Sequence, residues 1–490
     1  MNVWVLNPPF LPKYSRPQRS PAVTKSGTVY FPLWLAYATG VLEAAGHQVT
    51  LTDAAARSVP LNAVLAEVPR LQPDLIVMDT STPSIENDLG VAAALKQACP
   101  GVAVVLVGTH VTACAEEVLA GGAAADAVAR REYDYTLREL AAVMAANGNR
   151  WPDAARLAGV AGLSFRADGR VVHNPDRPFI ENLDELPWVS RVYRRHLDIR
   201  DYFNQNALYP MVTLITSRGC PFRCNFCVYP QVLTGRRCRE RSIGDVVDEM
   251  AYVVQEFPEA RSIFFEDDTL TAQKSRCLEL AEAIGQRKLT IPWEANSRVD
   301  VDHETMQRIR AAGCRELCVG FESGSQAVLD RMHKGTRIER MHAFMRNARR
   351  AGVLVHGCFM FGFPDETAAD VRLTMDLALR LNPDTAQFYP VMVYPGTEAY
   401  EEYRSRGWLA AGSYRDWLTA EGLHNCVIRN QHMTSAELVR LCDQARRRFY
   451  LRPGYLAYKL AQLARHPREW QRTLKAGGVF LRYLARGSRV

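Results

Sequence analysis

Several features are missing from this 490-residue sequence, and each absence narrows its class. No stretch approaches the roughly 18 uncharged apolar residues of a membrane span. Met1 is followed by "NVWVLNPPF" rather than by a basic start, an apolar run and a cleavage site. We therefore expect a cytoplasmic protein. The net charge of +7 comes without a basic block interleaved with aromatics, so we expect no nucleic-acid partner.

The cysteines do not form the pattern of a disulfide framework, because twelve are scattered along a chain expected in a reducing compartment. Cys220, Cys224 and Cys227 nevertheless lie together in "SRGCPFRCNFC". A zinc site usually has four ligands in paired C-x-x-C units, and no second pair exists. A redox C-x-x-C would leave Cys220 without a role. Three thiolates can hold three irons of a cubane cluster and leave the fourth iron open, with zinc or packing as alternatives.

Residues 1–145 alternate Val/Ile/Leu-rich runs with helical stretches, a pattern typical of buried parallel strands in a doubly wound, Rossmann-like α/β domain. Its ligand should lie at the carboxyl ends of the strands. No G-x-G-x-x-G follows the first run, which disfavours a nicotinamide dinucleotide. Residues 146–205 look like a connector that contains a hairpin with an Asp-Gly turn.

Residues 206–405 contain six further strand and helix units, which predict a partial (β/α)6 barrel of the TIM type with its active site at the carboxyl ends of the strands. The cysteine stretch follows the first of these strands. Residues 406–490 are expected to be a mostly helical C-terminal region.

The spacing C-x-x-x-C-x-x-C, with Phe226 before the last cysteine, resembles the radical S-adenosylmethionine (radical SAM) superfamily. In that family a [4Fe-4S] cluster binds SAM at its open iron and cleaves it to a 5′-deoxyadenosyl radical. Motifs at the next four strand ends are also similar, and the resemblance implies cofactor contacts by Glu266, Asp267, Asp268, Arg298, Glu322, Ser323, Gly362 and Pro364. The last loop departs from the family in having Asp365 where a glycine is usual.

Taken singly, each of these residues has an ordinary structural explanation. Acidic residues at a strand end are often solvated or cap a helix, and a lone arginine such as Arg298 is more often part of a surface ion pair. The functional interpretation depends on their order, because five motifs fall at five successive strand ends of one predicted barrel.

A doubly wound domain before such a barrel resembles the cobalamin-binding domain of cobalamin-dependent radical SAM proteins. Its strand ends then imply cobalamin contacts by Asn7, Thr80, Ser81, Gly108, His110 and Thr112. The D-x-H-x-x-G motif that supplies a histidine to cobalt in other cobalamin proteins is absent. His110 is a candidate substitute, although a loop role beside the corrin is the favoured interpretation.

The resemblance implies that the radical takes a hydrogen atom from an unactivated carbon of a natural-product or lipid intermediate, which then receives a methyl group from methylcobalamin. A non-methylating oxidation, cyclisation or ring rearrangement is the alternative, and a sensor without turnover is a third. The cluster also needs an external electron donor such as flavodoxin or ferredoxin.

The substrate is not indicated by any motif. Pocket candidates are Tyr389, Tyr394, Tyr414, Trp417 and His424, although such residues are core or surface aromatics by default. The basic tail from Tyr455 to Val490 could contact an anionic membrane, but a helical cap on the barrel is favoured. Most remaining cysteines are expected to be buried, whereas Cys318 and Cys358, on predicted barrel strands, are candidates for facing the cavity.

Overall fold

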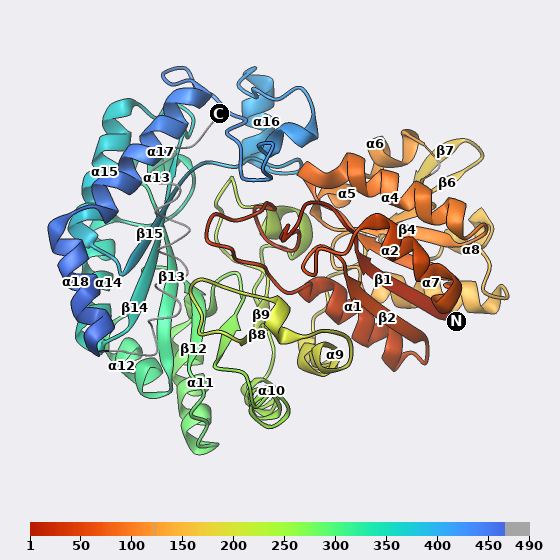
Figure 1. Ribbon diagram of the computed structural model, residues 1–490, viewed down its shortest axis with the longest axis horizontal. Coiled ribbons are helices and arrows are strands. Elements are labelled where there is room, and N and C mark those ends of the chain that lie inside the picture. Colours follow the sequence, from red (N-terminus) through yellow and green to blue (C-terminus); the bar gives the residue numbers. More distant parts are fainter. Residues whose placement is uncertain (123, 466–490) are drawn as a thin grey trace.

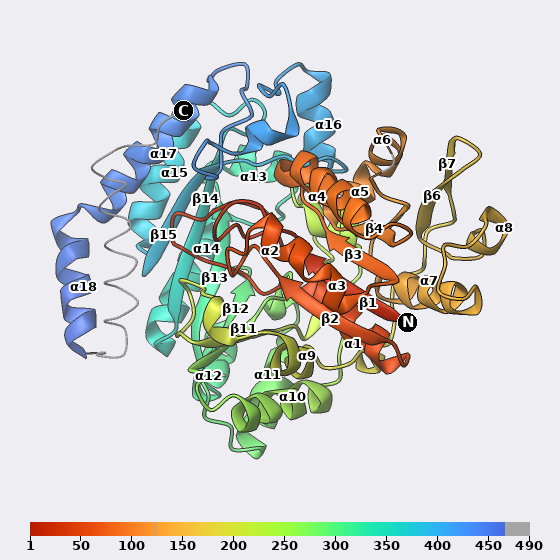
Figure 2. The same cartoon turned by 45° about the vertical axis from the view of Figure 1, so that its right-hand side comes forward.

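The computed structural model describes residues 1–122 and 124–465. Two α/β units lie side by side, with the N-terminal unit in red to yellow and the second unit in green to blue (Figure 1). A long segment, residues 8–32, leaves the N-terminal sheet and reaches toward the second unit before it returns to the first helix (Figures 1 and 2). The expected α/β architecture is confirmed.

The N-terminal sheet has the strand order β2-β1-β3-β4-β5-β6-β7. Its first five strands are parallel, as predicted. Their bounds are β1 Asn2–Asn7, β2 Gln48–Asp53, β3 Leu75–Asp79, β4 Ala103–Val107 and β5 Ala127–Ala129. The chain order reverses between β1 and β3, and the crevice at such a switch point is where doubly wound sheets bind ligands.

The predicted hairpin forms between β6 (Leu163–Ala167) and β7 (Arg170–His173). Its turn residues Asp168 and Gly169 have φ values of 49° and 74°, the left-handed backbone that an Asp-Gly turn provides. Strand β6 pairs antiparallel with β5. This part of the segment expected to be a connector therefore extends the N-terminal sheet.

Alternate residues of the central strands pack into two separate cores, because successive side chains of a strand point to opposite faces. Val5 and Val77 belong to the larger core, which continues into the second unit. Leu6 and Met78 belong to a smaller core on the other face. The covering helices are α1 Leu33–Ala44, α2 Leu61–Ala66, α3 Val68–Leu71, α4 Ile85–Ala98, α5 Thr109–Ala113, α6 Ala115–Ala120 and α7 Asp134–Ala146.

The short helix α8 (Ala154–Leu157) precedes the hairpin and lies at the outer edge of the N-terminal unit (Figure 1). Between the two units run α9 (Val189–His196) and two short 3-10 turns, η2 (Leu183–Glu185) and η3 (Ile199–Asp201). Their apolar side chains, among them Leu186, Val189 and Val192, are buried in the larger core. The segment thus joins the two sheets through a shared apolar interior.

The second unit contains six parallel strands in the order β15-β14-β13-β12-β11-β8, so each strand pairs with its neighbour in the chain. Their bounds are β8 Met211–Leu214, β11 Ser262–Phe265, β12 Trp293–Ser297, β13 Cys314–Glu322, β14 Leu354–Phe361 and β15 Thr385–Pro390. In the described part of the chain the end strands β8 and β15 do not pair with each other. The predicted partial barrel is confirmed.

The barrel helices follow the strands and cover their outer face (Figure 1). Their bounds are α10 Ile243–Glu256, α11 Lys274–Gln286, α12 His303–Ala311, α13 Gln326–Arg331, α14 Ile338–Ala351, α15 Ala368–Leu381 and α16 Glu398–Ser405. A two-stranded ribbon, β9 (Ser217–Arg218) with β10 (Arg239–Glu240), and the turns η4 (Tyr229–Leu233) and η5 (Leu270–Ala272) complete the unit.

The C-terminal region is helical in its later described part, where α17 spans Ser435–Tyr450 and α18 spans Pro453–Arg465. Residues 406–434 are mainly irregular and contain one short helical turn, η6 (Tyr414–Trp417). Most of the basic tail from Tyr455 to Val490 lies outside the described residues. No helix in the described part of the chain is long and apolar enough to cross a membrane.

Candidate functional site

The three clustered cysteines lie on the loop between β9 and η4, beyond the carboxyl end of the first barrel strand. Gly219 precedes them with a φ of +89°, and a Cβ at this position would overlap the carbonyl of Arg237. The backbone N–H of Cys220 donates to the carbonyl of Gly235 at 3.1 Å. A glycine is therefore required where the loop folds back.

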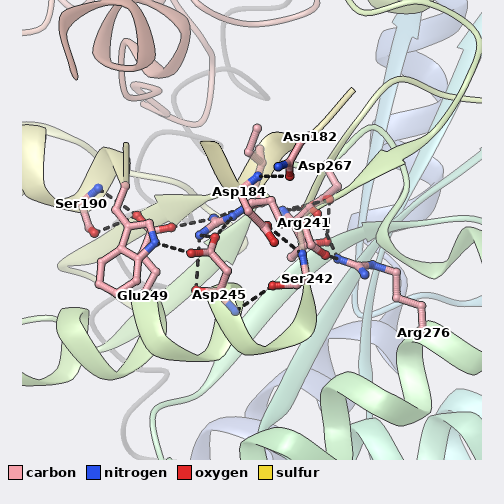
Figure 3. Close-up of polar contacts among 12 residues, drawn as sticks. Asn182, Asp184, Ser190, Arg241, Ser242, Asp245, Glu249, Asp267 and Arg276 are labelled. Carbon is pink, nitrogen blue, oxygen red and sulfur yellow. Dashed lines mark hydrogen bonds and ion pairs between the residues drawn. The ribbon is translucent and has the colours of Figure 1, made fainter. Parts of the chain in front are cut away.

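The chain that leads into this loop is held by a buried polar network around Asp267 (Figure 3). The Asp267 carboxylate accepts hydrogen bonds from the Thr216 N–H at 3.1 Å, the Thr216 hydroxyl at 2.9 Å and the Ser217 hydroxyl at 2.5 Å. Arg276 donates to the carbonyls of Thr216 and Arg241. Asp267 was predicted to contact a cofactor, but its bonds in this structure position the strand before the cysteines.

The neighbouring carboxylates, Glu266 and Asp268, form ion pairs with Arg19 at 2.5 and 3.0 Å. Arg19 belongs to segment 8–32, and its guanidinium lies 4.9 Å from the ring centre of Tyr229. One buried oxygen of Glu266 has no hydrogen-bond partner. Burial raises the pKa of Glu266 to about 7, although the positive charge of Arg19 opposes the rise. This oxygen is available to a positively charged or hydrogen-donating ligand.

The cysteine thiols are in an environment that favours their protonated form. Burial raises the pKa of Cys220 to about 11 and that of Cys227 to about 12, and the charge of Asp268 contributes to both shifts. Positively charged iron would reverse this balance, because metal binding displaces thiol protons.

Arg298, at the end of β12, packs against the cysteine loop. Its guanidinium carbon lies 3.7 Å from the ring centre of Phe222, between the first two cysteines. One terminal nitrogen donates to the Thr336 hydroxyl at 3.0 Å, whereas the buried Nε makes no hydrogen bond and lies 3.8 Å from the Asp300 carboxylate, with which it forms an ion pair. The Nε–H can still donate to an anionic group beside the cluster.

Glu322 and Ser323 follow the fourth strand in different roles. Glu322 has a φ of +63° and forms a buried ion pair with Lys334 at 2.7 Å, and its second carboxylate oxygen has no partner. The Ser323 hydroxyl lies 3.2 Å from that of Thr374 and accepts the N–H of Ser325. Glu322 thus keeps one oxygen for a ligand, whereas Ser323 positions its loop.

The fifth strand end packs on the cysteine loop through an aromatic pair. The ring of Phe226 meets that of Phe363 edge to face, with centres 5.7 Å apart. Gly362 has a φ of +98°, and a Cβ there would lie 2.8 Å from a side chain of α17. Asp365, where a glycine is usual, has a φ of +58° and supplies the same left-handed backbone. The carbonyl of Pro364 accepts a hydrogen bond from Arg331 at 3.2 Å.

A small crevice lies between the two units, at the carboxyl ends of the N-terminal strands. Its walls come from both units and from segment 8–32, and the lining residues are Arg16, Pro17, Gln18, Trp34, Asp79, Thr80, Gly108, Thr109, Tyr133, Tyr229 and Leu233. Two predicted cobalamin contacts, Thr80 and Gly108, are among them. Gly108 has a φ of +112°, and a Cβ there would lie 2.5 Å from the Thr80 carbonyl oxygen.

Three other predicted contacts are engaged within the protein, and two of them, Asn7 and Ser81, are buried. The Asn7 amide donates to Asp53 at 2.8 Å. The Ser81 hydroxyl lies 2.9 Å from that of Tyr14, and the Thr112 hydroxyl donates to the Gly108 carbonyl at 2.8 Å. These side chains hold the loops around the crevice and are not among its lining residues.

His110 is also buried beside the crevice rather than in its wall. Its Nδ1 lies 3.2 Å from the Thr82 hydroxyl, and its ring contacts that of Tyr414, with centres 4.7 Å apart. Burial lowers the pKa of His110 to about 4, so the ring is neutral at pH 7. Its Nε2 has no hydrogen-bond partner. This placement suits a neutral loop residue better than a ligand of cobalt.

Among the predicted pocket aromatics, Tyr389 is the one that the structure associates with the barrel interior. Its neighbour Phe388 packs near Phe449 of α17 on the outer face of β15, with ring centres 6.0 Å apart, so alternation along the strand points Tyr389 to the interior. Tyr414 packs on the N-terminal unit, and Trp417 donates to the carbonyl of Val393 at 2.9 Å. Tyr394 is buried, and His424 contacts the carbonyl of Ser20.

Buried ion pairs fix the crevice relative to the cysteine loop. Arg218, two residues before Cys220, pairs with Asp134 of the N-terminal unit at 2.8 Å. Arg239 pairs with Glu132 at 2.6 Å. All four charged side chains are at most 3% exposed, so separating the units would leave uncompensated buried charges.

Comparisons with known proteins agree with this geometry. A model of the radical SAM superfamily matches residues 214–378, and a model of the B12 binding domain matches residues 19–141. The "Uncharacterized methyltransferase PH0819" of Pyrococcus horikoshii is 31% identical over 88% of this chain and 90% of its own length. The anaerobic magnesium-protoporphyrin IX monomethyl ester cyclase of Rubrivivax gelatinosus is 27% identical over 87% of this chain and 75% of its own.

A solved structure has a similar fold. TsrM from Kitasatospora setae, a radical SAM methyltransferase with cobalamin and a [4Fe-4S] cluster bound, superposes with a TM-score of 0.67 at 19% identity. The match covers 90% of this chain and 84% of that one. The chain therefore belongs to the cobalamin-dependent radical SAM enzymes, and its cofactors are a [4Fe-4S] cluster, S-adenosylmethionine and cobalamin.

Proposed function

We propose that the protein transfers a methyl group to an unactivated carbon of a small-molecule or lipid intermediate. One observation carries the proposal: Tyr229, two residues beyond Cys227, lines the crevice between the units together with Thr80 and Gly108. The cysteine loop and the predicted cobalamin edge of the N-terminal sheet thus meet at one wall. A methyl carrier in the crevice would be next to the place where the substrate radical forms.

In this proposal the cluster and SAM supply a 5′-deoxyadenosyl radical, and cobalamin supplies the methyl group. The chain holds the cluster with Cys220, Cys224 and Cys227. The unpartnered oxygens of Glu266 and Glu322 and the Nε–H of Arg298 would orient the amino, ribose and carboxylate groups of SAM. Segment 8–32 excludes water from the barrel mouth through the ion pairs of Arg19.

A non-methylating rearrangement is the second candidate, because the relative from Rubrivivax gelatinosus, a cyclase, matches nearly as much of the chain as the methyltransferase does. Both candidates use the same three cofactors. They differ in whether SAM also supplies a methyl group to cobalamin.

A test without substrate separates the two candidates. The protein is reconstituted anaerobically with iron, sulfide and hydroxocobalamin, reduced with titanium(III) citrate and given SAM carrying a 13C methyl group. Formation of labelled methylcobalamin, followed by absorbance and mass spectrometry, supports methyl transfer. Release of 5′-deoxyadenosine with no labelled methylcobalamin favours the rearrangement. Cys220→Ala is the matched control, and it should lose 5′-deoxyadenosine formation but keep cobalamin binding.

The electron donor is proposed to be an external flavodoxin or ferredoxin that docks beside the cysteine loop. An open depression of about 560 Å³ lies there, and its lining includes Arg223, inside the cysteine motif, and Arg236. These cations can meet the acidic surface of such a donor. Arg223→Glu should slow turnover driven by flavodoxin while turnover driven by dithionite stays unchanged; equal slowing with both reductants would contradict this docking site. Membrane contact through the basic tail from Tyr455 to Val490 stays a proposal, which liposome flotation of the chain lacking the residues after 455 can test.

A further inference from the structure

Two neighbouring barrel strands bring together a second set of metal-ligating side chains. Cys318 lies on β13, and His356 and Cys358 lie on β14. One ligand atom from each of these residues lies within 4.8 Å of the other two. The two sulfur atoms are 4.0 Å apart. None of the three belongs to the cysteine loop or to the crevice between the units.

The strand register explains why the three side chains converge. His356 and Cys358 are two residues apart on β14, so they point to the same face. Cys318 lies directly opposite His356 in the parallel pairing of β13 with β14. The alternate residues Leu317 and Val319 belong to the apolar core under the helices. The face that carries the cluster is therefore the barrel interior.

The spacing of the sulfur atoms matches a shared metal ion. Zinc–sulfur bonds of about 2.3 Å at a tetrahedral angle place two thiolates about 3.8 Å apart. The observed separation of 4.0 Å is close to this value. A disulfide needs about 2.05 Å, so the same two sulfur atoms would have to move together by about 2 Å to form one.

A further contact orients the histidine as a ligand. The Nδ1 atom of His356 lies 2.7 Å from the Thr385 hydroxyl on β15. Metal-bound histidines almost always engage their second ring nitrogen in such a hydrogen bond, which fixes the ring and its tautomer. Because Nδ1 is engaged by Thr385, Nε2 is the ring nitrogen that remains for a metal ion. His356 is 2% exposed, so the ring is held in a dry environment.

We propose that Cys318, His356 and Cys358 bind a zinc ion in the barrel interior, at a site separate from the iron–sulfur cluster. Two thiolates and an imidazole are ligands that zinc prefers, and two thiolates neutralise its charge in a buried site. Binding replaces the two thiol protons, which are released to solvent. The site goes beyond the proposed methyl transfer and does not require it.

Three protein ligands leave the fourth position of the zinc ion open, as in catalytic rather than structural zinc sites. This position opens to the barrel interior, the face of the sheet to which alternation along β15 also points Tyr389. It would take water or an anionic oxygen or sulfur atom of the substrate, and this last part rests on the proposed function. Zinc would then hold the substrate while the two cofactors act on a nearby carbon.

The first experiment measures zinc and iron in the same full-length protein. The anaerobic, cluster-loaded chain is incubated with one equivalent of Zn²⁺, passed through a desalting column and analysed for both metals. We expect about one zinc per chain. His356→Ala, Cys318→Ser and Cys358→Ser should each lose the zinc and keep the iron, whereas Cys220→Ala should lose the iron and keep the zinc. Cys426→Ser is the matched control, because Cys426 is buried elsewhere and donates to the Ile428 carbonyl as a serine can.

A second variant guards against misfolding of the ligand variants. Thr385→Val removes only the hydroxyl that orients His356 and should weaken zinc affinity about 10- to 100-fold in a competition titration with a chelator. Absence of zinc from the parent protein, or retention of zinc after loss of His356 or of either cysteine, overturns the proposal. Because zinc is measured without substrate or turnover, this result is independent of whether the chain transfers methyl groups.

Discussion

Adjacent carboxylates at the end of β11 have different roles in the structure, and exchanging each for alanine tests that difference. Asp267→Ala removes the acceptor for three buried donors, namely the N–H and hydroxyl of Thr216 and the hydroxyl of Ser217. Each unsatisfied buried donor costs about 1 to 3 kcal/mol. Burial raises the pKa of Asp267, which means that its charged form is disfavoured in the folded protein, so removing the charge offsets part of this cost. We expect a net loss of about 3 kcal/mol in stability, together with loss of iron, because the donors lead directly into Cys220.

Asp268→Ala is the matched comparison. Asp268 contacts Arg19, which is 30% exposed in its side chain, and the Thr234 hydroxyl at 3.2 Å. Its loss should lower the melting temperature by at most a few degrees and keep the iron, but it should reduce 5′-deoxyadenosine formation. Thermal unfolding, iron analysis and product measurement on both variants test whether Asp267, and not Asp268, holds the chain that leads into Cys220. Normal unfolding and full iron content in Asp267→Ala would refute the reasoning.

Three further predictions concern the crevice and the SAM side of the barrel. Burial raises the pKa of Asp79 to about 7, so the folded state favours the neutral form of this side chain. The free energy of unfolding therefore falls by up to about 4 kcal/mol as pH rises from about 4 to 7. Asp79→Asn should raise the melting temperature of the cofactor-free chain at pH 8 but not at pH 4. Gly108→Ala should weaken hydroxocobalamin binding in equilibrium dialysis because its Cβ would collide with the crevice wall, whereas Gly90→Ala, with open space around it, should not. Lys334→Met should cost about 3 to 5 kcal/mol by leaving Glu322 unpaired. The cost should fall as pH falls, because burial raises the pKa of Glu322 and the unpaired carboxyl can take up a proton. Adding Glu322→Gln should restore most of the melting temperature, and no recovery would contradict the ion-pair explanation.

The elements that the sequence predicted well are those specified by local pattern. Runs of Val, Ile and Leu identified the parallel strands of the N-terminal sheet, and the alternation of strands with amphipathic helices identified those of the second. The cysteine loop was evident because its three thiols lie within eight residues. Asp365 was noted as a departure from the family, and its left-handed backbone shows that aspartate can replace the usual glycine there.

What the sequence could not indicate depends on contacts between distant segments. Arg19 pairs with Glu266 across 247 positions, and no local pattern predicts such a contact. The different role of Asp267 left no such signal either, because Glu266, Asp267 and Asp268 follow β11 in a loop where strand alternation does not apply. The Cys318 and His356 pairing likewise depends on the register of β13 with β14, which the sequence alone does not specify.

The buried ion pairs between the units explain how one chain can serve two cofactors at one substrate carbon. Methyl transfer to a short-lived radical requires the methyl carrier and the radical centre to be held in a fixed relative orientation. Arg218 and Arg239, which flank the cysteine loop, pair with Asp134 and Glu132 at the start of α7 and just before it. Separating the units would break both pairs and divide the apolar core that continues from one unit into the other, so hinge motion at this junction is unfavourable.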